Sequence, residues 1–301
     1  MVRVVTLCAA GVAALLAPAV AHAYGWPIQP FDQQHAIRSA FDDPRSGLGP
    51  GGLLEHSFHF GVDISAPDGT PVYAVEPGTV YLYADAVDVK QADGHEFAYW
   101  HIWADVTEHS YVHSGDLLGF VRAPWGHVHF AEFDGTNYVN PLRPDGLQPF
   151  TDDTTPVVGP IVVHTEDGRL NATVEVYDTP PIAPPPPWQN SRWTPALVRW
   201  RLLRDGREVL PWRVAADFRT ALLPPQDYAS VYAPGTTQNG PGSPGRYVFW
   251  LVHGLDTAAL PVGSYELEVA AEDTRDNTGT AAVTFTLAEG QSRNTTKSPS
   301  R

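Results

Sequence analysis

The sequence predicts an all-β protein of two domains. Its 301 residues include 29 prolines and 26 glycines, spread between short runs of β-branched and aromatic residues. The sequence contains no long apolar stretch with a 3.6-residue period, so helices are not expected to dominate. A chain of about 300 residues can form two cores of ordinary size. We expect a small, curved antiparallel β-sandwich or barrel, followed by a second β-sandwich.

Residues 1–23 have the form of a secretory signal peptide. Arg3 gives a short positive start, an apolar run follows, and residues 21–23 (Ala-His-Ala) fit a signal-peptidase site. An uncleaved membrane anchor is the alternative, but the apolar run is short and no stop-transfer pattern follows. We therefore expect a secreted or cell-wall-associated protein, cleaved after Ala23, with no integral membrane segment in the mature chain.

The composition limits the kinds of site that the mature chain can carry. The only cysteine, Cys8, lies inside the predicted signal peptide, so a zinc site must use histidine and carboxylate ligands. The chain has 34 acidic and 19 basic residues. Binding of nucleic acid through a basic surface is therefore not expected.

The first domain is expected over residues 24–150. A short helix is expected around residues 34–41, and residues 47–52 form a glycine-rich loop. Residues 41–45 (Phe-Asp-Asp-Pro-Arg) are either part of a substrate groove or a surface turn. Alternating and β-branched runs predict strands, separated by Pro-Asp-Gly, Pro-Gly and Ser-Gly-Asp turns. These strands are expected at residues 62–64, 71–75, 79–83, 96–103, 117–121 and 127–130.

A linker is expected over residues 151–159, a second domain over 160–288 and a disordered tail over 289–301. The clearest signal in the second domain is a hairpin, residues 263–273 and 281–287, with a turn between. It is similar to bacterial immunoglobulin-like β-sandwich modules. The proline-rich segments 179–187 and 224–245 are expected as long loops. Asp273 and Asp276 either bind calcium or shape the hairpin turn, and the turn is the better supported alternative.

Histidines are concentrated in the first domain. Eight of the twelve fall between residues 56 and 129. Four of these adjoin turns or charged residues and are interpreted as surface histidines: His56, His95, His109 and His113. Among them, His56 is close enough to His59 to line a site.

Spacing limits how the remaining polar residues can meet. His127 and His129 are two residues apart in a strand, so they share a face at about 6.6 Å, and one can bind a metal beside the other. His59 and Asp63 would be about 13 Å apart in a straight strand, too far to share an ion. Gly61 and Pro67 disfavour a helix, so a bend at Gly61 is expected.

Residues 59–80 (HFGVDISAPDGTPVYAVEPGTV) resemble the first motif, turn and strand of the lysostaphin-like zinc endopeptidases. Residues 99–102 (YWHI) resemble the Tyr-x-His segment of this family. Residues 115–119 (GDLLG) resemble its glycine-bounded strand, and residues 126–130 (GHVHF) its closing His-x-His. The resemblance covers about residues 55–143.

The resemblance implies that zinc is bound by His59, Asp63 and His129, and that His101 and His127 are catalytic histidines that do not bind the metal. Two imidazoles and one carboxylate would leave a fourth position open, and the zinc charge would lower the pKa of a water molecule. The sequence has no His-Glu-x-x-His helix to supply a glutamate base. His101 and His127 are therefore the candidates for base and oxyanion donor, in either order.

One departure from the family concerns the residues after the His-x-His. The family often has Phe-Glu there, whereas here Ala131 follows Phe130 and Glu132 comes one later. A shift of one residue reverses the face of a strand, so Glu132 should not replace the missing carboxylate.

The resemblance implies a secreted zinc metalloendopeptidase that hydrolyses peptide bonds of peptidoglycan or of another extracellular peptide substrate. The alternative is a zinc-bearing protein without hydrolytic activity that binds the cell wall or activates another hydrolase. A third hypothesis, an adhesin, explains the C-terminal half but not the histidines. The presence of all five site residues favours the enzyme.

Overall fold

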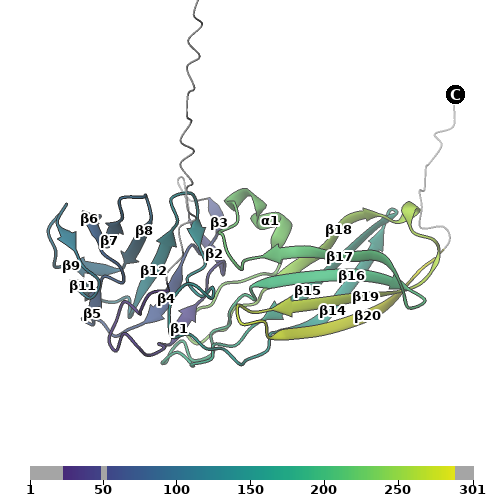
Figure 1. The fold of residues 1–301 in the computed structure, drawn as a ribbon. Coiled ribbons are helices and arrows are strands. Elements are labelled where there is room, and N and C mark those ends of the chain that lie inside the picture. The colour runs from purple at the N-terminus through teal and green to yellow at the C-terminus, as the bar shows by residue number, and fades with distance from the viewer. Residues whose placement is uncertain (1–22, 49–52, 289–301) are drawn as a thin grey trace, which may run out of the picture.

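A computed structural model describes residues 23–48 and 53–288 and confirms the all-β fold. Its two β domains lie end to end along the long axis of the molecule (Figure 1). Residues 1–22 of the predicted signal peptide, residues 49–52 of the glycine-rich loop and the predicted tail, residues 289–301, lie outside the described residues. Within the described ranges, no helix has the length and apolar character needed to cross a membrane.

The first domain contains a sheet of eight strands and a sheet of three, and all strand pairs are antiparallel. The large sheet has the order β1-β4-β12-β8-β7-β6-β10 with β13 beside β12, and the small sheet has the order β5-β11-β9. The strands are β1 (Ile37–Ser39), β4 (Val62–Ser65), β5 (Pro71–Tyr73), β6 (Gly78–Leu82), β7 (Ala86–Lys90), β8 (Glu96–Trp100), β9 (Ile102–Ala104), β10 (Tyr111–Val112), β11 (Leu117–Val121), β12 (His127–Phe133) and β13 (Tyr138–Val139).

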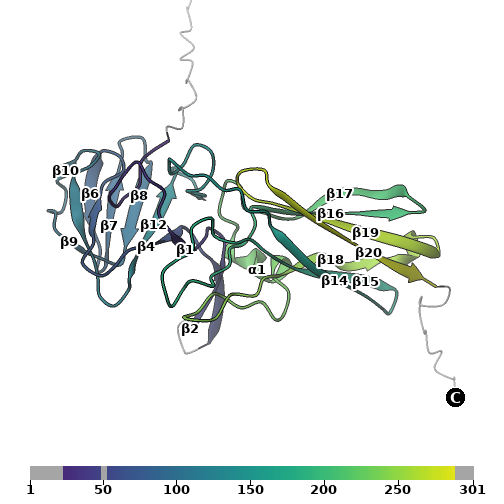
Figure 2. The same cartoon turned by 90° about the horizontal axis from the view of Figure 1, so that it is seen from below.

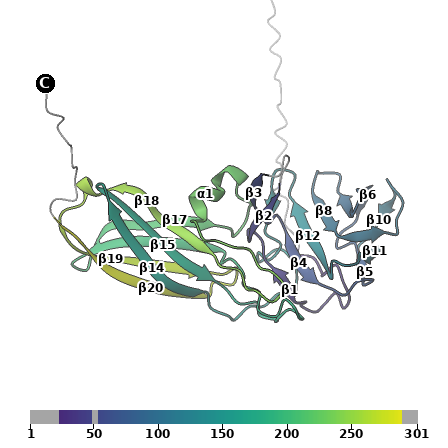
Figure 3. The ribbon, with the colours of Figure 1, turned by 180° about the vertical axis from the view of Figure 1, so that it is seen from behind.

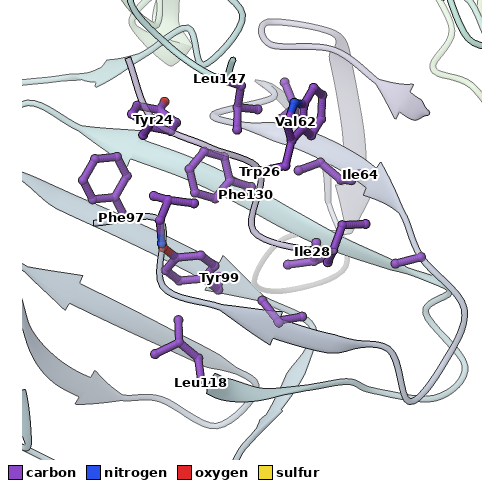
Figure 4. Close-up of a cluster of buried hydrophobic side chains, with 14 of the residues drawn as sticks. Tyr24, Trp26, Ile28, Val62, Ile64, Phe97, Tyr99, Leu118, Phe130 and Leu147 are labelled. Atoms are coloured by element: carbon purple, nitrogen blue, oxygen red, sulfur yellow. The ribbon is translucent and has the colours of Figure 1, made fainter. Parts of the chain in front are cut away.

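An apolar core fills the space between these two sheets (Figure 4). Val128 and Phe130 of β12 belong to this core, as does Leu118 of the small sheet. Because side chains alternate along a strand, His127 and His129, which flank Val128, are directed to the opposite face. The apolar pattern of β12 thus fixes which face of the sheet carries the histidines.

Two predicted secondary-structure elements of this domain differ from the structure. The helix expected at residues 34–41 is wrong, because Ile37–Ser39 form an edge strand that pairs with β4. Pairing with the sheet and burial of Ile37 override the local helical propensity. The strand expected at residues 96–103 is interrupted at His101, whose φ of 65° turns the chain from the large sheet into the small one.

The second domain consists of two facing sheets that share one core (Figure 2). Their orders are β14-β15-β18 and β17-β16-β19-β20. The hairpin predicted from residues 263–287 is confirmed as β19 and β20. β14 begins at Val157, inside the expected linker, and the immunoglobulin-like resemblance is not confirmed. The elements are β14 (Val157–Glu166), β15 (Arg169–Tyr177), β16 (Leu197–Arg204), β17 (Arg207–Asp217), η2 (Pro225–Asp227), α1 (Tyr228–Val231), β18 (Val248–Asp256), η3 (Thr257–Ala259), β19 (Gly263–Glu272) and β20 (Thr278–Leu287).

A hairpin of β2 (Pro44–Leu48) and β3 (Leu54–Phe58) lies between the two domains, beside α1 (Figure 3). Phe58, its last residue, is buried in the core of the second domain. In the other direction, Trp193 of the second domain is buried in the core of the first. Each domain therefore buries a side chain of the other, and Phe58, the residue before His59, is held at the junction between the two domains.

Candidate metal centre and cleft

His59, Asp63 and His129 converge at one end of β4 and β12. Nε2 of His59 lies 2.8 Å from Nδ1 of His129, and each of these nitrogens lies 3.1 Å from Oδ1 of Asp63. Asp63 and His129 are directly opposite each other in the antiparallel pairing of β4 with β12. Directly opposed side chains on one face are neighbours, so the strand register itself brings the carboxylate and the imidazole together.

His59 reaches the same point because the chain bends after β3. The bend expected at Gly61 is confirmed, since this residue lies between β3 and β4 outside both strands. A Cβ atom there would lie 2.3 Å from the carbonyl oxygen of Phe130. Gly61 is therefore required because the backbone of β12 approaches so closely.

Hydrogen bonds outside the cluster orient its ligand atoms. Nδ1 of His59 donates to the carbonyl oxygen of Ala40 at 2.8 Å, which leaves the lone pair on Nε2 for the cluster. Arg45 donates from Nη2 to Oδ2 of Asp63 at 3.0 Å, so Oδ1 is the oxygen left facing the two imidazoles. His59 and Asp63 are thus each held with an electron pair directed into the cluster.

The protonation states suit metal ligands. Burial lowers the pKa of His59, and it lowers that of His129 to about 4. Burial acts to raise the pKa of Asp63, but the neighbouring His59, His127 and His129 outweigh it and hold that pKa well below its ordinary value. At neutral pH the cluster therefore contains two neutral imidazoles and one carboxylate, the forms in which these side chains bind metal.

These three residues fit a zinc ion in number, chemistry and spacing. Two imidazole nitrogens and a carboxylate oxygen are typical of a catalytic zinc site with one open position. A tetrahedral zinc ion with bonds of about 2.0–2.1 Å would hold its ligand atoms about 3.3 Å apart. The three atoms here are separated by 2.8 to 3.1 Å, so only a small expansion is needed.

His127 lies beside this cluster on β12. Its Nδ1 donates to the carbonyl oxygen of Trp125 at 2.9 Å, and its Nε2 lies 3.5 Å from Oδ1 of Asp63. The hydrogen bond from Nδ1 makes Nε2 the acceptor nitrogen of the ring. That nitrogen accepts from Nη2 of Arg38 at 3.2 Å.

His101 lies at the corner between β8 and β9, and its ring centroid is 4.8 Å from that of His127. It stacks on Trp125 with ring centroids 3.8 Å apart, and its Nδ1 lies 3.5 Å from Oδ2 of Asp85. Burial, together with the neighbouring His127 and His129, lowers the pKa of His101 to about 4. The structure therefore brings all five predicted site residues to one place.

A cavity of about 440 Å³ opens over these residues. Its walls come from both domains. The second domain contributes Trp188 from the loop between β15 and β16, and Gln238 and Asn239 from the loop before β18. Gln238 and Asn239 belong to the proline-rich segment 224–245 that was expected as a long loop, and Trp188 directly follows the other such segment, 179–187.

Arg38, Arg45 and Trp188 also line the cavity, and the sequence did not identify them as individual site residues. Arg38 falls within the segment expected to be helical. Arg45 belongs to residues 41–45, for which a surface turn was one alternative; that alternative is wrong, because Asp42 and Asp43 are fully buried. Ile37, Arg38 and Ser39 are too few and do not alternate between apolar and polar, so the sequence carried no signal for this strand.

Three other residues considered in the sequence analysis lie outside the cluster. Glu132 does not reach the cluster, as expected; it is buried and pairs with Arg143. His95, expected on the surface, is half-buried and lies 2.8 Å from Oε1 of Glu132. His56 stacks on Tyr228 and does not line the cavity.

Asp273 accepts hydrogen bonds from the backbone of Arg275 and Asn277, which supports its predicted role in the turn. It also lies with Asp152 and Asp178 in a compact acidic group.

Comparison with known proteins identifies residues 57–141 as a match to the model of Peptidase family M23. The chain is 33% identical over 94 residues to "DD-carboxypeptidase/endopeptidase Mpg" of Neisseria meningitidis serogroup B and of Neisseria gonorrhoeae, which covers 28% of this chain. The match spans only 22% of the length of those relatives.

Two solved structures are also similar. The Csd3 structure of Helicobacter pylori has a TM-score of 0.32 and 22% identity, over 40% of this chain and 34% of that one. A zinc-containing peptidase from Vibrio cholerae has a TM-score of 0.32 and 22% identity, over 40% of this chain and 39% of that one.

Proposed function

From the match of residues 57–141 to the model of Peptidase family M23, we propose that the protein is a secreted zinc-dependent endopeptidase that hydrolyses peptide bonds of peptidoglycan. The observation that carries the proposal is the convergence of His59, Asp63 and His129 within 3.1 Å of one another beneath an open cavity. The Neisseria relatives are named as a carboxypeptidase and endopeptidase, which supports hydrolysis of a peptide bond.

His59, Asp63 and His129 would hold the metal. Zinc, when bound, supplies a Lewis acid that polarises a peptide carbonyl and lowers the pKa of a water molecule. Arg45 keeps one oxygen of Asp63 occupied and thereby fixes which oxygen serves as ligand. Ala40 fixes the His59 ring in the same way.

His101 and His127 would move the proton and stabilise the charge that develops on the carbonyl oxygen. Each ring has its Nδ1 next to an oxygen, that of the Asp85 carboxylate or that of the Trp125 carbonyl. The hydrogen bond to Trp125 leaves Nε2 of His127 as the acceptor that now pairs with Arg38. Nδ1 of His101 makes no hydrogen bond among the described residues, and this ring is stacked on Trp125. Nε2 of His127 lies 3.5 Å from the carboxylate of Asp63, within reach of a reactant bound at the cluster.

The cleft is rich in aromatic groups. Phe60, Trp100, Trp125 and Trp188 all line it. Such side chains supply apolar contact area while their flat faces leave room for a main chain. Through Trp188, the second domain forms one wall of the groove.

The test is release of new amino termini from purified peptidoglycan, measured together with zinc content by mass spectrometry. Alanine at position 101 or 127 should lower the rate on the order of 10²–10⁴-fold while zinc stays bound. Zinc bound at stoichiometry in a wild-type protein that releases nothing from several wall types would favour the alternative, a zinc-bearing wall-binding or hydrolase-activating protein.

A further inference from the structure

Arg38 lies in the wall of the cleft, and the metal cluster does not require it. Its Nη1 donates to the carbonyl oxygen of Trp125 at 3.1 Å and its Nη2 to Nε2 of His127 at 3.2 Å. Its Nε lies 3.9 Å from Oδ2 of Asp63, farther than the nearest nitrogen of Arg45 at 3.0 Å. Each terminal nitrogen of a guanidinium carries two N–H bonds, so these hydrogen bonds leave donors available in the cavity.

Trp188 of the second domain holds this guanidinium in place. The guanidinium carbon of Arg38 lies 4.4 Å from the centroid of the Trp188 ring. Trp188 is itself fixed on a turn, because its backbone N–H donates to Pro185 at 3.0 Å and the preceding Pro187 accepts from Gly242. Stacking on the flat face restricts the guanidinium while leaving its edge free for hydrogen bonds.

The charge of the cavity favours an anion. Its lining contains two guanidinium groups, of Arg38 and Arg45, and one carboxylate, of Asp63. Arg45 is already engaged by Asp63 and by Ser39. A divalent ion on the ligand cluster would add further positive charge. The lining is thus positive although the whole chain has a net charge of −15.

The geometry points to Arg38, braced by Trp188, as the receptor for a carboxylate of the substrate next to the bond that is cut. This inference rests on the proposed function and defines its substrate class as peptides with a free carboxylate within about one residue of the scissile amide. Arg38 contacts His127, which borders the ligand cluster, and consecutive residues of a peptide are about 3.8 Å apart. A guanidinium binds a carboxylate through two parallel hydrogen bonds, which gives direction as well as affinity.

A pair of matched peptides tests this directly. Acetyl-Lys-D-Ala-D-Ala with a free C-terminal carboxylate is compared with its C-terminal amide, and acetyl-Lys-D-Ala-D-Glu amide separates a side-chain carboxylate from a terminal one. Wild-type protein should cleave at least one of the carboxylate peptides about tenfold or more faster than the neutral peptide, mainly through KM. Equal cleavage of the neutral and both acidic peptides would overturn the inference.

Variants separate substrate binding from a structural role of Arg38. Arg38→Met should remove the preference between acidic and neutral peptides, Arg38→Lys should restore part of it, and Trp188→Ala should weaken it. If Arg38 only oriented His127, Arg38→Met would lower kcat equally for every peptide and leave the preference intact. Arg122, which stacks on Trp103 at 4.4 Å and is not among the residues lining the cavity, provides the matched control as Arg122→Met.

Binding to metal-stripped protein, measured by calorimetry, gives a readout that does not depend on catalysis. A carboxylate can also bind a metal ion, so removal of the metal isolates the contribution of Arg38. Metal-stripped protein is expected to bind the carboxylate peptides more tightly than the neutral peptide, and Arg38→Met should abolish this difference in affinity. If no peptide and no peptidoglycan were cleaved, the proposed function would fail, while this binding order would still decide the inference about Arg38.

Discussion

Two buried polar clusters lie close together on the same strand, β12, and they differ in whether their polar atoms already have partners. Glu132 is 1% exposed; it accepts hydrogen bonds from both terminal nitrogens of Arg143, is hydrogen-bonded by Tyr24, and lies 2.8 Å from His95. Around His129, two imidazole nitrogens and a carboxylate oxygen converge instead, and Nε2 of His129 has no hydrogen-bond partner among the described residues.

The difference shows how to separate a structural cluster from a functional one. The charge of Glu132 is balanced by Arg143, and the pKa of Glu132 is lowered because hydrogen bonds from His95 and Arg143 outweigh the effect of burial. The other cluster directs electron pairs towards one another and opens into a cavity of about 440 Å³. Only the second arrangement becomes satisfied when a cation is added.

The largest effect is expected from removing one ligand. His59→Ala should abolish stoichiometric zinc binding and lower peptidoglycan hydrolysis on the order of 1000-fold or more, because two ligands remain for the ion. Metal content and amino-terminus release are measured on the same sample. His95→Ala, from the cluster around Glu132, is the control, and it should keep both. If His95→Ala also lost zinc, the conclusion that only the cluster around His129 binds the metal would be contradicted.

The next effect concerns stability. Arg143→Met leaves the Glu132 carboxylate buried without its cation, which should lower the free energy of unfolding by about 3–5 kcal/mol. Urea unfolding followed by tryptophan fluorescence measures it. The folded fraction should still bind one zinc ion, because Arg143 has no contact with the ligand cluster. A loss below about 1 kcal/mol would show that Arg143 is not needed to compensate the Glu132 charge.

A smaller effect is expected at Arg45. Arg45→Met removes the hydrogen bond to Oδ2 of Asp63 without removing a ligand. Zinc affinity should fall about 10–100-fold, as for other partners of metal ligands, and competition with a chelator measures the change. Unchanged affinity would mean that the strand register alone orients Asp63.

The smallest effect is a pH dependence. The pKa of Glu132 in the folded state lies below its ordinary value, so its contribution to stability is present above the unfolded pKa and is lost as pH falls through the folded pKa. Glu132→Gln should therefore be less stable than wild type at neutral pH, and the difference should shrink as pH falls below the ordinary glutamate pKa of about 4.3. Unfolding curves at several pH values test this, and a constant difference would contradict the assignment.

The local part of the site could be predicted from sequence. Alternation of apolar and polar residues in β12 placed His127 and His129 on one face, and the spacing of His59 and Asp63 required the bend found at Gly61. The same alternation excluded Glu132 from the cluster. These predictions succeeded because each depends on the periodicity of a few consecutive residues.

The part set by tertiary packing could not be predicted. Arg38 is in the cleft because Ile37–Ser39 pair with β4, a contact that overrides the helical propensity expected there. Trp188 reaches the cleft because the second domain packs against the first through Phe58 and Trp193. Neither contact has a signature in the neighbouring residues. Zinc ligation, the roles of His101 and His127, the domain boundaries and the signal peptide stay predictions.

The central claim is that His59, Asp63 and His129 bind a single zinc ion. X-ray absorption at the zinc edge of the purified wild-type protein tests it most directly. The expected result is one zinc ion per chain with two imidazole nitrogens and at least one carboxylate oxygen at about 2.0–2.2 Å. A protein that retains no zinc after purification in its presence, or a zinc spectrum that is unchanged in the Asp63→Ala variant, would contradict it.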